Sequence, residues 1–258
     1  MAHVIAITNQ KGGVGKTTTA INLAASLSAH QQSVLLIDLD PQGNATMGCG
    51  IEKNQLAHTS CEVILHDCLA QQACLTVPCG FDVMPTNADL TVAEISLMAR
   101  IHRETFLLKA IAPLQSQYDY ILIDCPPTLN TLTLNALVAA DAALIPMQCE
   151  YYALEGLAAL LSTIEQIQAS VNPRLQIAGL LRTMYNPRSR LCSDVSKQLL
   201  AHFGSKVYRT IIPRNVRLAE APSHGLSALY YDKCSPGASA YMVLAQEIME
   251  KQATESPA

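Results

Sequence analysis

The stretch from Thr8 to Ala20 reads TNQKGGVGKTTTA, and it joins the apolar run HVIAIT to a helical pattern that begins at about Lys16. A strand, a glycine-rich turn and a helix in this order point several backbone N–H groups at one phosphate. An ordinary glycine-rich turn between a strand and a helix is the alternative. We expect the β-phosphate of a nucleotide to be held by the N–H groups of Gly13, Val14, Gly15 and Lys16.

Two side chains at the start of the helix complete the expected nucleotide site. The Lys16 ammonium would reach the β- and γ-phosphates, and the Thr17 hydroxyl would bind Mg²⁺. Gly12 and Thr18 flank these residues and belong to the same expected site. The sequence therefore predicts a nucleotide-binding protein that uses Mg²⁺.

The loop departs from the ordinary phosphate-binding pattern at its start, where Gln10 stands in place of a glycine and Lys11 follows. Lys11 is badly placed to reach the phosphate of its own loop, but it can point outward to a nucleotide in a second subunit. Gly12 and Gly13 would then let two backbones approach closely. A solvated surface lysine is the alternative, and chemistry alone leaves it open.

Carboxylates end two further apolar runs. LLIDLDPQGNAT places Asp38 at the end of a strand and Asp40 on the following loop, where a carboxylate can orient the attacking water. YDYILIDCPP ends in Asp124, which would meet Mg²⁺ through its water shell. Ligands bind at this edge of an open α/β sheet, so Thr17, Asp40 and Asp124 form the expected metal site. For Asp38, a purely structural carboxylate or helix cap remains an alternative.

Short apolar runs alternate with helical patterns along the whole chain, and half of the 258 residues are hydrophobic. This predicts an α/β fold with one doubly wound, mostly parallel sheet and helices on both faces. We expect one domain over residues 1–250 and a frayed tail over 251–258, with one long helix through AEISLMARIHRETFLLKAI. The expected strands cover residues 3–8, 33–38, 81–85, 118–124, 142–147, 175–184 and 206–212, and further helices cover 154–170, 189–203 and 236–250.

Five motifs together resemble the ParA/Soj family of chromosome and plasmid partitioning ATPases, over nearly the whole chain from about His3 to Met249. The motifs are KGGVGKTTTAINLA, DLDPQGNAT, YILIDCPPTL, QCEYYALEGL and IPRNVRLAEAPSHG. The first three are shared with MinD and the nitrogenase iron protein, whereas the last two are more specific. The resemblance implies Mg²⁺-dependent ATP hydrolysis, with Lys11, Lys16, Asp40 and Asp124 as catalytic residues.

The resemblance also implies partners. Family members form ATP-sandwich homodimers in which the residue matching Lys11 crosses to the partner's nucleotide. The dimers bind double-stranded DNA without sequence preference, and a ParB/Spo0J-like centromere-binding protein stimulates hydrolysis and releases them. A cytoplasmic, nucleoid-associated protein is therefore expected. Adenine would pack against residues after the last strands, here Met184, Pro213 and Asn215.

The charge distribution is an independent argument for DNA binding. The chain carries a net charge of −4, yet residues 174–217 hold nine of its 17 basic residues and one acidic residue, Asp194. A basic segment on an acidic protein suits salt-sensitive, sequence-independent contacts with phosphates. A solvated charged face is the alternative. The resemblance favours Arg188 and Arg217 as DNA contacts, and Arg190 is a plausible addition.

Other classes fit the sequence less well. The N-terminal run reads as a first strand rather than a signal peptide, and no apolar stretch reaches membrane-spanning length. The C-terminal MVLAQEIMEKQATESPA lacks the basic amphipathic character of MinD-like membrane-binding helices. Five of the nine cysteines lie between Cys49 and Cys79 without the paired spacing of a zinc site. An iron–sulfur protein would need a second cysteine to match Cys125.

Overall fold

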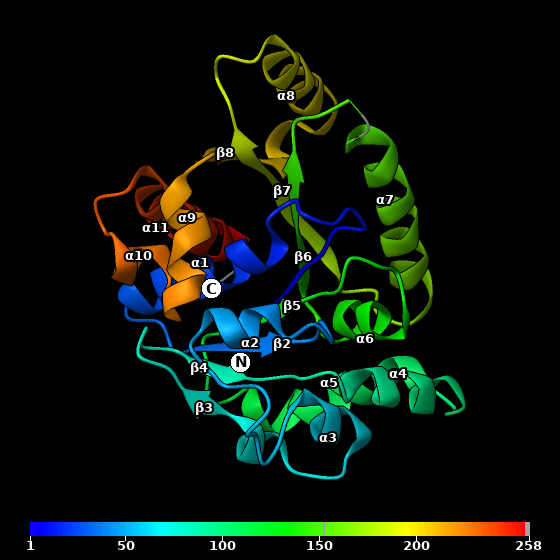
Figure 1. Cartoon of the computed structure of the whole chain (residues 1–258). Coiled ribbons are helices and arrows are strands. Elements are labelled where there is room, and N and C mark those ends of the chain that lie inside the picture. The colour runs from blue at the N-terminus through cyan, green and yellow to red at the C-terminus, as the bar shows by residue number, and fades with distance from the viewer. Residues whose placement is uncertain (152, 256–258) are drawn as a thin grey trace.

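The computed structural model describes residues 1–151 and 153–255, and in this part of the chain one eight-stranded sheet runs through the molecule (Figure 1). Its strand order is β3-β4-β2-β5-β1-β6-β7-β8, and every neighbouring pair is parallel except β3 and β4. The predicted sheet class is confirmed. The strands are β1 (His3–Ile7), β2 (Val34–Asp38), β3 (Leu75–Thr76), β4 (Asp82–Met84), β5 (Tyr120–Asp124), β6 (Ala142–Gln148), β7 (Gln176–Tyr185) and β8 (Val207–Pro213).

Helices cover both faces of this sheet, and each face has its own apolar core. In β1 the side chains alternate: Ile5 and Ile7 belong to one core, whereas Val4 and Ala6 belong to the other. The first core contains α1 (Lys16–Ala29), α2 (Asn44–Gly48), α9 (Val216–Glu220), α10 (Ala228–Tyr231) and α11 (Pro236–Glu255). The second contains α3 (Ser60–Leu65), α4 (Leu90–Met98), α5 (Phe106–Ile111), α6 (Thr131–Ala139), α7 (Ala153–Ser170) and α8 (Arg190–Phe203).

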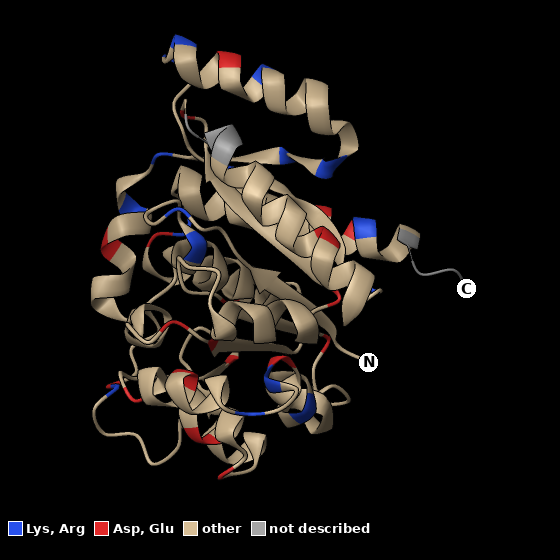
Figure 2. Cartoon of the chain, turned by 90° about the vertical axis from the view of Figure 1, so that its right-hand side faces the viewer, with Lys and Arg blue, Asp and Glu red and all other residues tan. Residues whose placement is uncertain are grey.

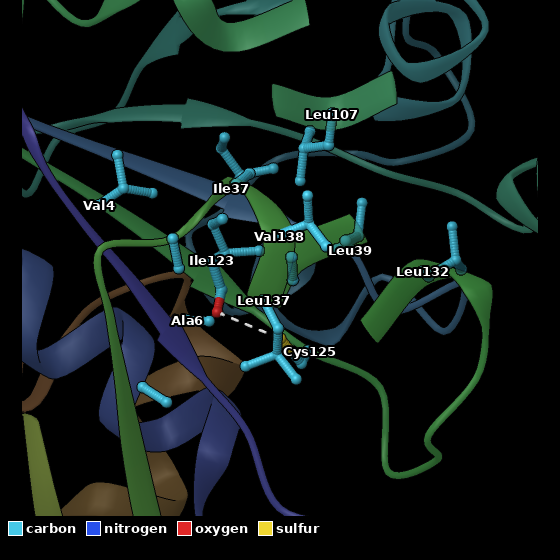
Figure 3. Close-up of a cluster of buried hydrophobic side chains, with 14 of the residues drawn as sticks. Val4, Ala6, Ile37, Leu39, Leu107, Ile123, Cys125, Leu132, Leu137 and Val138 are labelled. Carbon is cyan, nitrogen blue, oxygen red and sulfur yellow. Dashed lines mark hydrogen bonds between the residues drawn. The ribbon is translucent and has the colours of Figure 1, made fainter. Parts of the chain in front are cut away.

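The second core shows how the sheet and its helices pack. Figure 3 draws part of this core, in which Val4, Ile37 and Ile123 from neighbouring strands belong to one buried cluster with Leu107 of α5 and Leu137 of α6. All five side chains are almost fully buried. Such aliphatic packing agrees with a sequence that has no tryptophan and few phenylalanines.

The register of the strands brings the predicted carboxylates together. Asp124 at the end of β5 lies opposite Ile7 at the end of β1, and opposite Asp38 at the end of β2. All three strands therefore end at the same edge of the sheet, where the loop between β1 and α1 also begins. This edge is the site predicted for ligands in an open parallel sheet.

The prediction of one long helix after β4 is wrong. Helix α4 ends at Met98, and a 3₁₀ turn (Arg103–Thr105) and α5 follow it. His102 has a φ of 55°, in the left-handed region. The Asn135 side chain of α6 donates to the Arg103 carbonyl at 2.8 Å and accepts from the Leu107 N–H at 3.1 Å. A buried amide on another helix thus replaces the helical hydrogen bonds that the break removes.

The C-terminal helix α11 runs to Glu255, past Lys251, where fraying was expected to begin. Residues 256–258 of the expected tail lie outside the described part. Further 3₁₀ turns lie at Ala70–Ala73, Ala112–Leu114, Gly204–Lys206 and Ala221–His224.

Candidate functional site

The loop between β1 and α1 has the backbone of a phosphate-binding turn. Gly13 and Gly15 have φ values of 74° and 88°, a region that side chains disfavour. Space is open around Gly12 and Gly13, where an added Cβ would meet nothing within 4 Å. The Lys16 ammonium donates to the Lys11 carbonyl at 3.2 Å, so it lies over the loop. The loop glycines, Lys16, Thr17 and Thr18 therefore line one space.

Asp124 is the most unusual carboxylate in the described structure. It is fully buried, and neither oxygen accepts a well-aligned hydrogen bond among the described residues, although the Thr17 hydroxyl lies nearby. Burial raises its pKa well above the ordinary value, and Asp38 raises it further, whereas the Thr17 hydroxyl and Lys16 lower it. A buried unpaired carboxylate close to a threonine hydroxyl is a suitable environment for Mg²⁺ with its water shell.

Asp38 has a structural role instead. Its carboxylate accepts from the Thr46 N–H at 2.8 Å and from the Thr46 hydroxyl at 2.7 Å. It also accepts from the Asp40 N–H at 3.2 Å, and the Thr46 hydroxyl in turn accepts from the Thr86 N–H. The Asp38 side chain therefore holds the loop that carries Asp40, as the structural alternative anticipated.

Asp40 lies at the rim of the same space. It is 8% exposed, and its Oδ1 accepts the Gln42 N–H at 3.0 Å. The fields of Asp40 and Asp124 raise the pKa of Lys16, although burial, the larger effect, lowers it. Lys16, Asp40 and Asp124 thus lie close enough to act on one bound group.

Lys11 contacts a residue to which the sequence assigned no role. Its ammonium lies 2.5 Å from the Glu150 carboxylate, in the motif that follows β6, and both side chains are substantially exposed. The Lys11 carbonyl, in contrast, turns inward to Lys16. An ion pair between residues so far apart in sequence has no local signal, so sequence reasoning could not find it.

The three residues expected around adenine line one cavity of about 340 Å³, which also contacts Gly15, Thr18 and Tyr241. Met184 has a φ of 48° and accepts a hydrogen bond from Gln148 on its sulfur. Asn215 uses its Oδ1 to cap α9 by accepting the Arg217 N–H at 3.0 Å.

This cavity adjoins a second hollow of about 640 Å³, which contacts Lys16, Thr17, Asp40 and Pro127. Gly15, Thr18 and Met184 border both. Together the two spaces extend from the loop that would hold the phosphates to the end of β8, so they offer an extended ligand one continuous site.

The basic residues of segment 174–217 differ in their surroundings. Arg182 is buried and bonded to Ser196 and to the carbonyls of Tyr208 and Arg209, so it is a structural residue. Arg190 is paired with Asp194, and Arg217 with Glu220 and Asp232. Arg188 is exposed and has no ion pair in the described part of the chain. Figure 2 shows blue segments gathered around α8 and the adjoining strands.

Neither a membrane-spanning helix nor a cluster of metal ligands is found in the described residues. None of their helices is long and apolar enough to cross a bilayer. Three or more His, Cys, Asp or Glu side chains never come together there in a way that could hold a metal ion. The Mg²⁺ site considered above is different in kind, since Mg²⁺ is commonly held by one carboxylate or hydroxyl together with substrate phosphates.

Comparison with known proteins agrees with this geometry. The family model described as "AAA domain" matches residues 2–177. The chromosome partitioning protein ParA of Myxococcus xanthus is 46% identical, over 100% of this chain and 91% of its own length. The sporulation initiation inhibitor protein Soj of Bacillus subtilis is 49% identical, over 96% of this chain and 98% of its own length.

A solved structure is similar as well. The cobyrinic acid a,c-diamide synthase of Mycobacterium smegmatis, crystallised with a bound ATP analog and magnesium, is 35% identical with a TM-score of 0.88. The alignment covers 99% of this chain and 98% of that protein. The two chains therefore share their fold over essentially their full length.

Proposed function

The chain belongs to the ParA/Soj family of chromosome partitioning ATPases, and on that premise we propose that it is a Mg²⁺-dependent ATPase that binds DNA while it holds ATP. In this proposal two copies enclose two ATP molecules, and the dimer binds double-stranded DNA without sequence preference. Hydrolysis, stimulated by a ParB/Spo0J-like centromere-binding protein, returns it to monomers. The protein would act in the cytoplasm, on the nucleoid.

The single observation that supports this most strongly is Asp124, buried and unpaired beside Lys16 and Thr17. An uncompensated buried carboxylate is costly to maintain, so it indicates a ligand. The related structure with an ATP analog and magnesium supports ATP and Mg²⁺ as that ligand. Mg²⁺ bound there would offset the charge of the phosphates.

The chain's own residues would then act in a defined order. The loop N–H groups of residues 13–16 bind the β-phosphate, and the Lys16 ammonium exchanges the Lys11 carbonyl for phosphate oxygens. Asp40 accepts a hydrogen bond from water and aligns it for in-line attack on the γ-phosphate. Asp38 keeps Asp40 in place by accepting the Asp40 N–H, and Thr46 holds the Asp38 carboxylate through two further hydrogen bonds. Adenine packs against Met184 and Pro213 in the smaller cavity.

Lys11 would link hydrolysis to assembly. To reach the partner's nucleotide, its ammonium must leave Glu150. Exposed ion pairs of this kind contribute little to stability, so the exchange for a phosphate in a buried interface is favourable. The dimer would bring two basic segments together, with Arg188, Arg190 and Arg217 as the first contacts with DNA phosphates.

The test is phosphate release by the purified protein with Mg²⁺ and ATP, in the presence of DNA, compared with Lys16→Ala and Asp40→Ala. We expect slow turnover that Lys16→Ala abolishes together with nucleotide binding. Asp40→Ala should keep ATP binding but lose about a hundredfold in rate or more, and remain on DNA. Hydrolysis by Asp40→Ala at the wild-type rate would remove Asp40 from the mechanism.

A further inference from the structure

The turn that carries Asp40 is closed by its own backbone and joined at its start to β2. The Gly43 N–H donates to the Asp40 carbonyl at 2.8 Å, and the Gln42 N–H donates to the Asp40 carboxylate at 3.0 Å. Residues 40–43 therefore form a β-turn. The Asp40 N–H donates to the carboxylate of Asp38, the last residue of β2. The carbonyl of Gln42 takes no part in these bonds.

Lys53, from the loop between α2 and α3, contacts this turn at Gln42 and Gly43. Its ammonium donates to the Gln42 carbonyl at 2.8 Å. A Cβ added at Gly43 would lie 3.1 Å from Cδ of Lys53 and 3.1 Å from the Thr86 carbonyl oxygen. Gly43 also has a φ of 63°. The absence of a side chain at Gly43 thus lets the Lys53 stem cross the turn closely.

The backbone around Lys53 is itself anchored, so this contact begins from a fixed point. The Ile51 N–H donates to the Thr46 carbonyl at 3.2 Å, and the Ile51 side chain packs against the first core. The Gln55 N–H donates to the Glu52 carbonyl at 3.2 Å, which closes a turn around Lys53. The Lys53 side chain is partly buried. Lys53 therefore connects an anchored segment to the turn that carries the proposed water-orienting carboxylate.

We propose that Lys53 is a positioning residue for hydrolysis, which holds the turn over residues 40–43 so that the Asp40 carboxylate stays directed at the attacking water. The inference rests on the proposed function, because it needs Asp40 to orient that water. Lys53 is not among the described residues that line the hollow above the phosphate loop, so it acts through the turn. Without this restraint Asp40 leaves its productive geometry more often, which slows the chemical step and leaves ATP binding unchanged.

Lys53→Met tests the proposal, because methionine keeps an apolar stem over Gly43 and removes the hydrogen-bond donors. We expect kcat for ATP hydrolysis to fall about three- to tenfold, as for the loss of one hydrogen bond to a carbonyl. KM for ATP should stay within about twofold, because turnover is slow and KM then reports binding. Lys53→Arg, which keeps a donor, should recover most of the rate.

Lys109→Met is the matched control for the loss of a lysine. Lys109 is exposed on α5 and forms no ion pair in the described part of the chain. Its variant should keep the wild-type kcat and KM. Equal loss of rate in Lys53→Met and Lys109→Met, or a change in KM with kcat unchanged, would overturn the proposal.

Two further measurements distinguish positioning of Asp40 from a general structural effect. In the Asp40→Ala background, Lys53→Met should lower the single-turnover rate no further, because the two residues act as one unit. In the nucleotide-free protein, the amides of Gln42 and Gly43 should exchange hydrogen faster in Lys53→Met, because both N–H groups bond to Asp40 within the turn. An additive loss of rate, or unchanged exchange at both amides, would contradict the assignment.

Hydrogen exchange also separates this inference from the proposed function. If the wild type released no phosphate from ATP, the proposed function would fail, and the role of Lys53 in hydrolysis would fail with it. Faster exchange in Lys53→Met would then still show that Lys53 holds the turn. If the wild type hydrolysed ATP and Lys53→Met did so at the same rate, the positioning role alone would be overturned.

Discussion

Asp38 and Asp124 are the same residue type, lie side by side on β2 and β5, and have different roles. Asp38 accepts three hydrogen bonds and holds the loop of Asp40. Asp124 accepts none from the described residues. The sequence could place both at the carboxyl edge of the sheet, because each ends an apolar run. The sequence could not separate their roles, because the hydrogen bonds from Thr46 of α2 to the Asp38 carboxylate are visible only in the folded structure.

Replacement of Asp124 by Asn tests its assignment as a ligand site. Burial raises the pKa of Asp124 because the ionised carboxylate is costly there, and the neutral amide removes that cost, so we expect the nucleotide-free protein to gain about 1 to 3 kcal/mol in unfolding free energy. The same variant should lose the stabilisation that MgATP gives the wild type. Thermal unfolding with EDTA and with MgATP measures both. If MgATP stabilised the Asp124→Asn variant as much as it stabilises the wild type, the assignment of Asp124 as a ligand site would be contradicted.

The ion pair with Glu150 holds the Lys11 side chain within its own subunit. Glu150→Gln removes the ion pair and leaves Lys11 free to cross to a partner, so dimerisation on ATP should need a few-fold less protein, consistent with about 0 to 1 kcal/mol for an exposed pair. Light scattering against protein concentration measures this, with Glu220→Gln as a control for loss of a surface carboxylate. If Glu150→Gln prevented dimerisation, Glu150 would have to act in the dimer rather than against it.

At the scale of elements, the strands and their order of appearance were predictable because near-continuous Val and Ile runs leave few alternatives. The break in the chain after α4 could not be predicted, because the sequence from Val92 to Ile111 has no proline or glycine to signal the end of a helix. The break depends on Asn135, a side chain on another helix that satisfies the freed backbone groups. The short antiparallel strand β3 likewise has no pattern of its own.

In the basic segment 174–217, too, the sequence alone does not tell which side chains are buried and which are exposed. Composition counts Arg182 and Arg188 equally, yet Arg182 joins β7 to α8 and β8 while Arg188 is exposed. Arg182→Ala should therefore lower the unfolding free energy by about 2 to 4 kcal/mol, because it leaves buried carbonyls unpaired. Arg188→Ala should leave stability unchanged but weaken DNA binding for all sequences and reduce its salt dependence. Urea unfolding and DNA titration of the two variants provide the comparison, and equal stability loss would contradict it.

At the scale of the whole molecule, the charge is divided: residues 174–217 carry +8, so the rest of the chain carries −12. If the chain binds DNA as proposed, this division would favour an approach of DNA to the exposed basic residues of this segment. Local motifs predicted the residues of the phosphate loop together with Asp40 and Asp124, and the family resemblance added the role of Lys11. The Lys11–Glu150 pair depends on which segments the folded chain brings together, and no local motif carries that information.

The central claim is that ATP, through Lys11, creates a DNA-binding dimer. The most direct measurement is binding to non-specific duplex DNA with ATP, with ADP and without nucleotide, at two salt concentrations, for the wild type and Lys11→Ala. The account predicts binding only with ATP, weaker at the higher salt concentration, and lost in Lys11→Ala. Binding that is equal in all nucleotide states, or unchanged in Lys11→Ala, would contradict it.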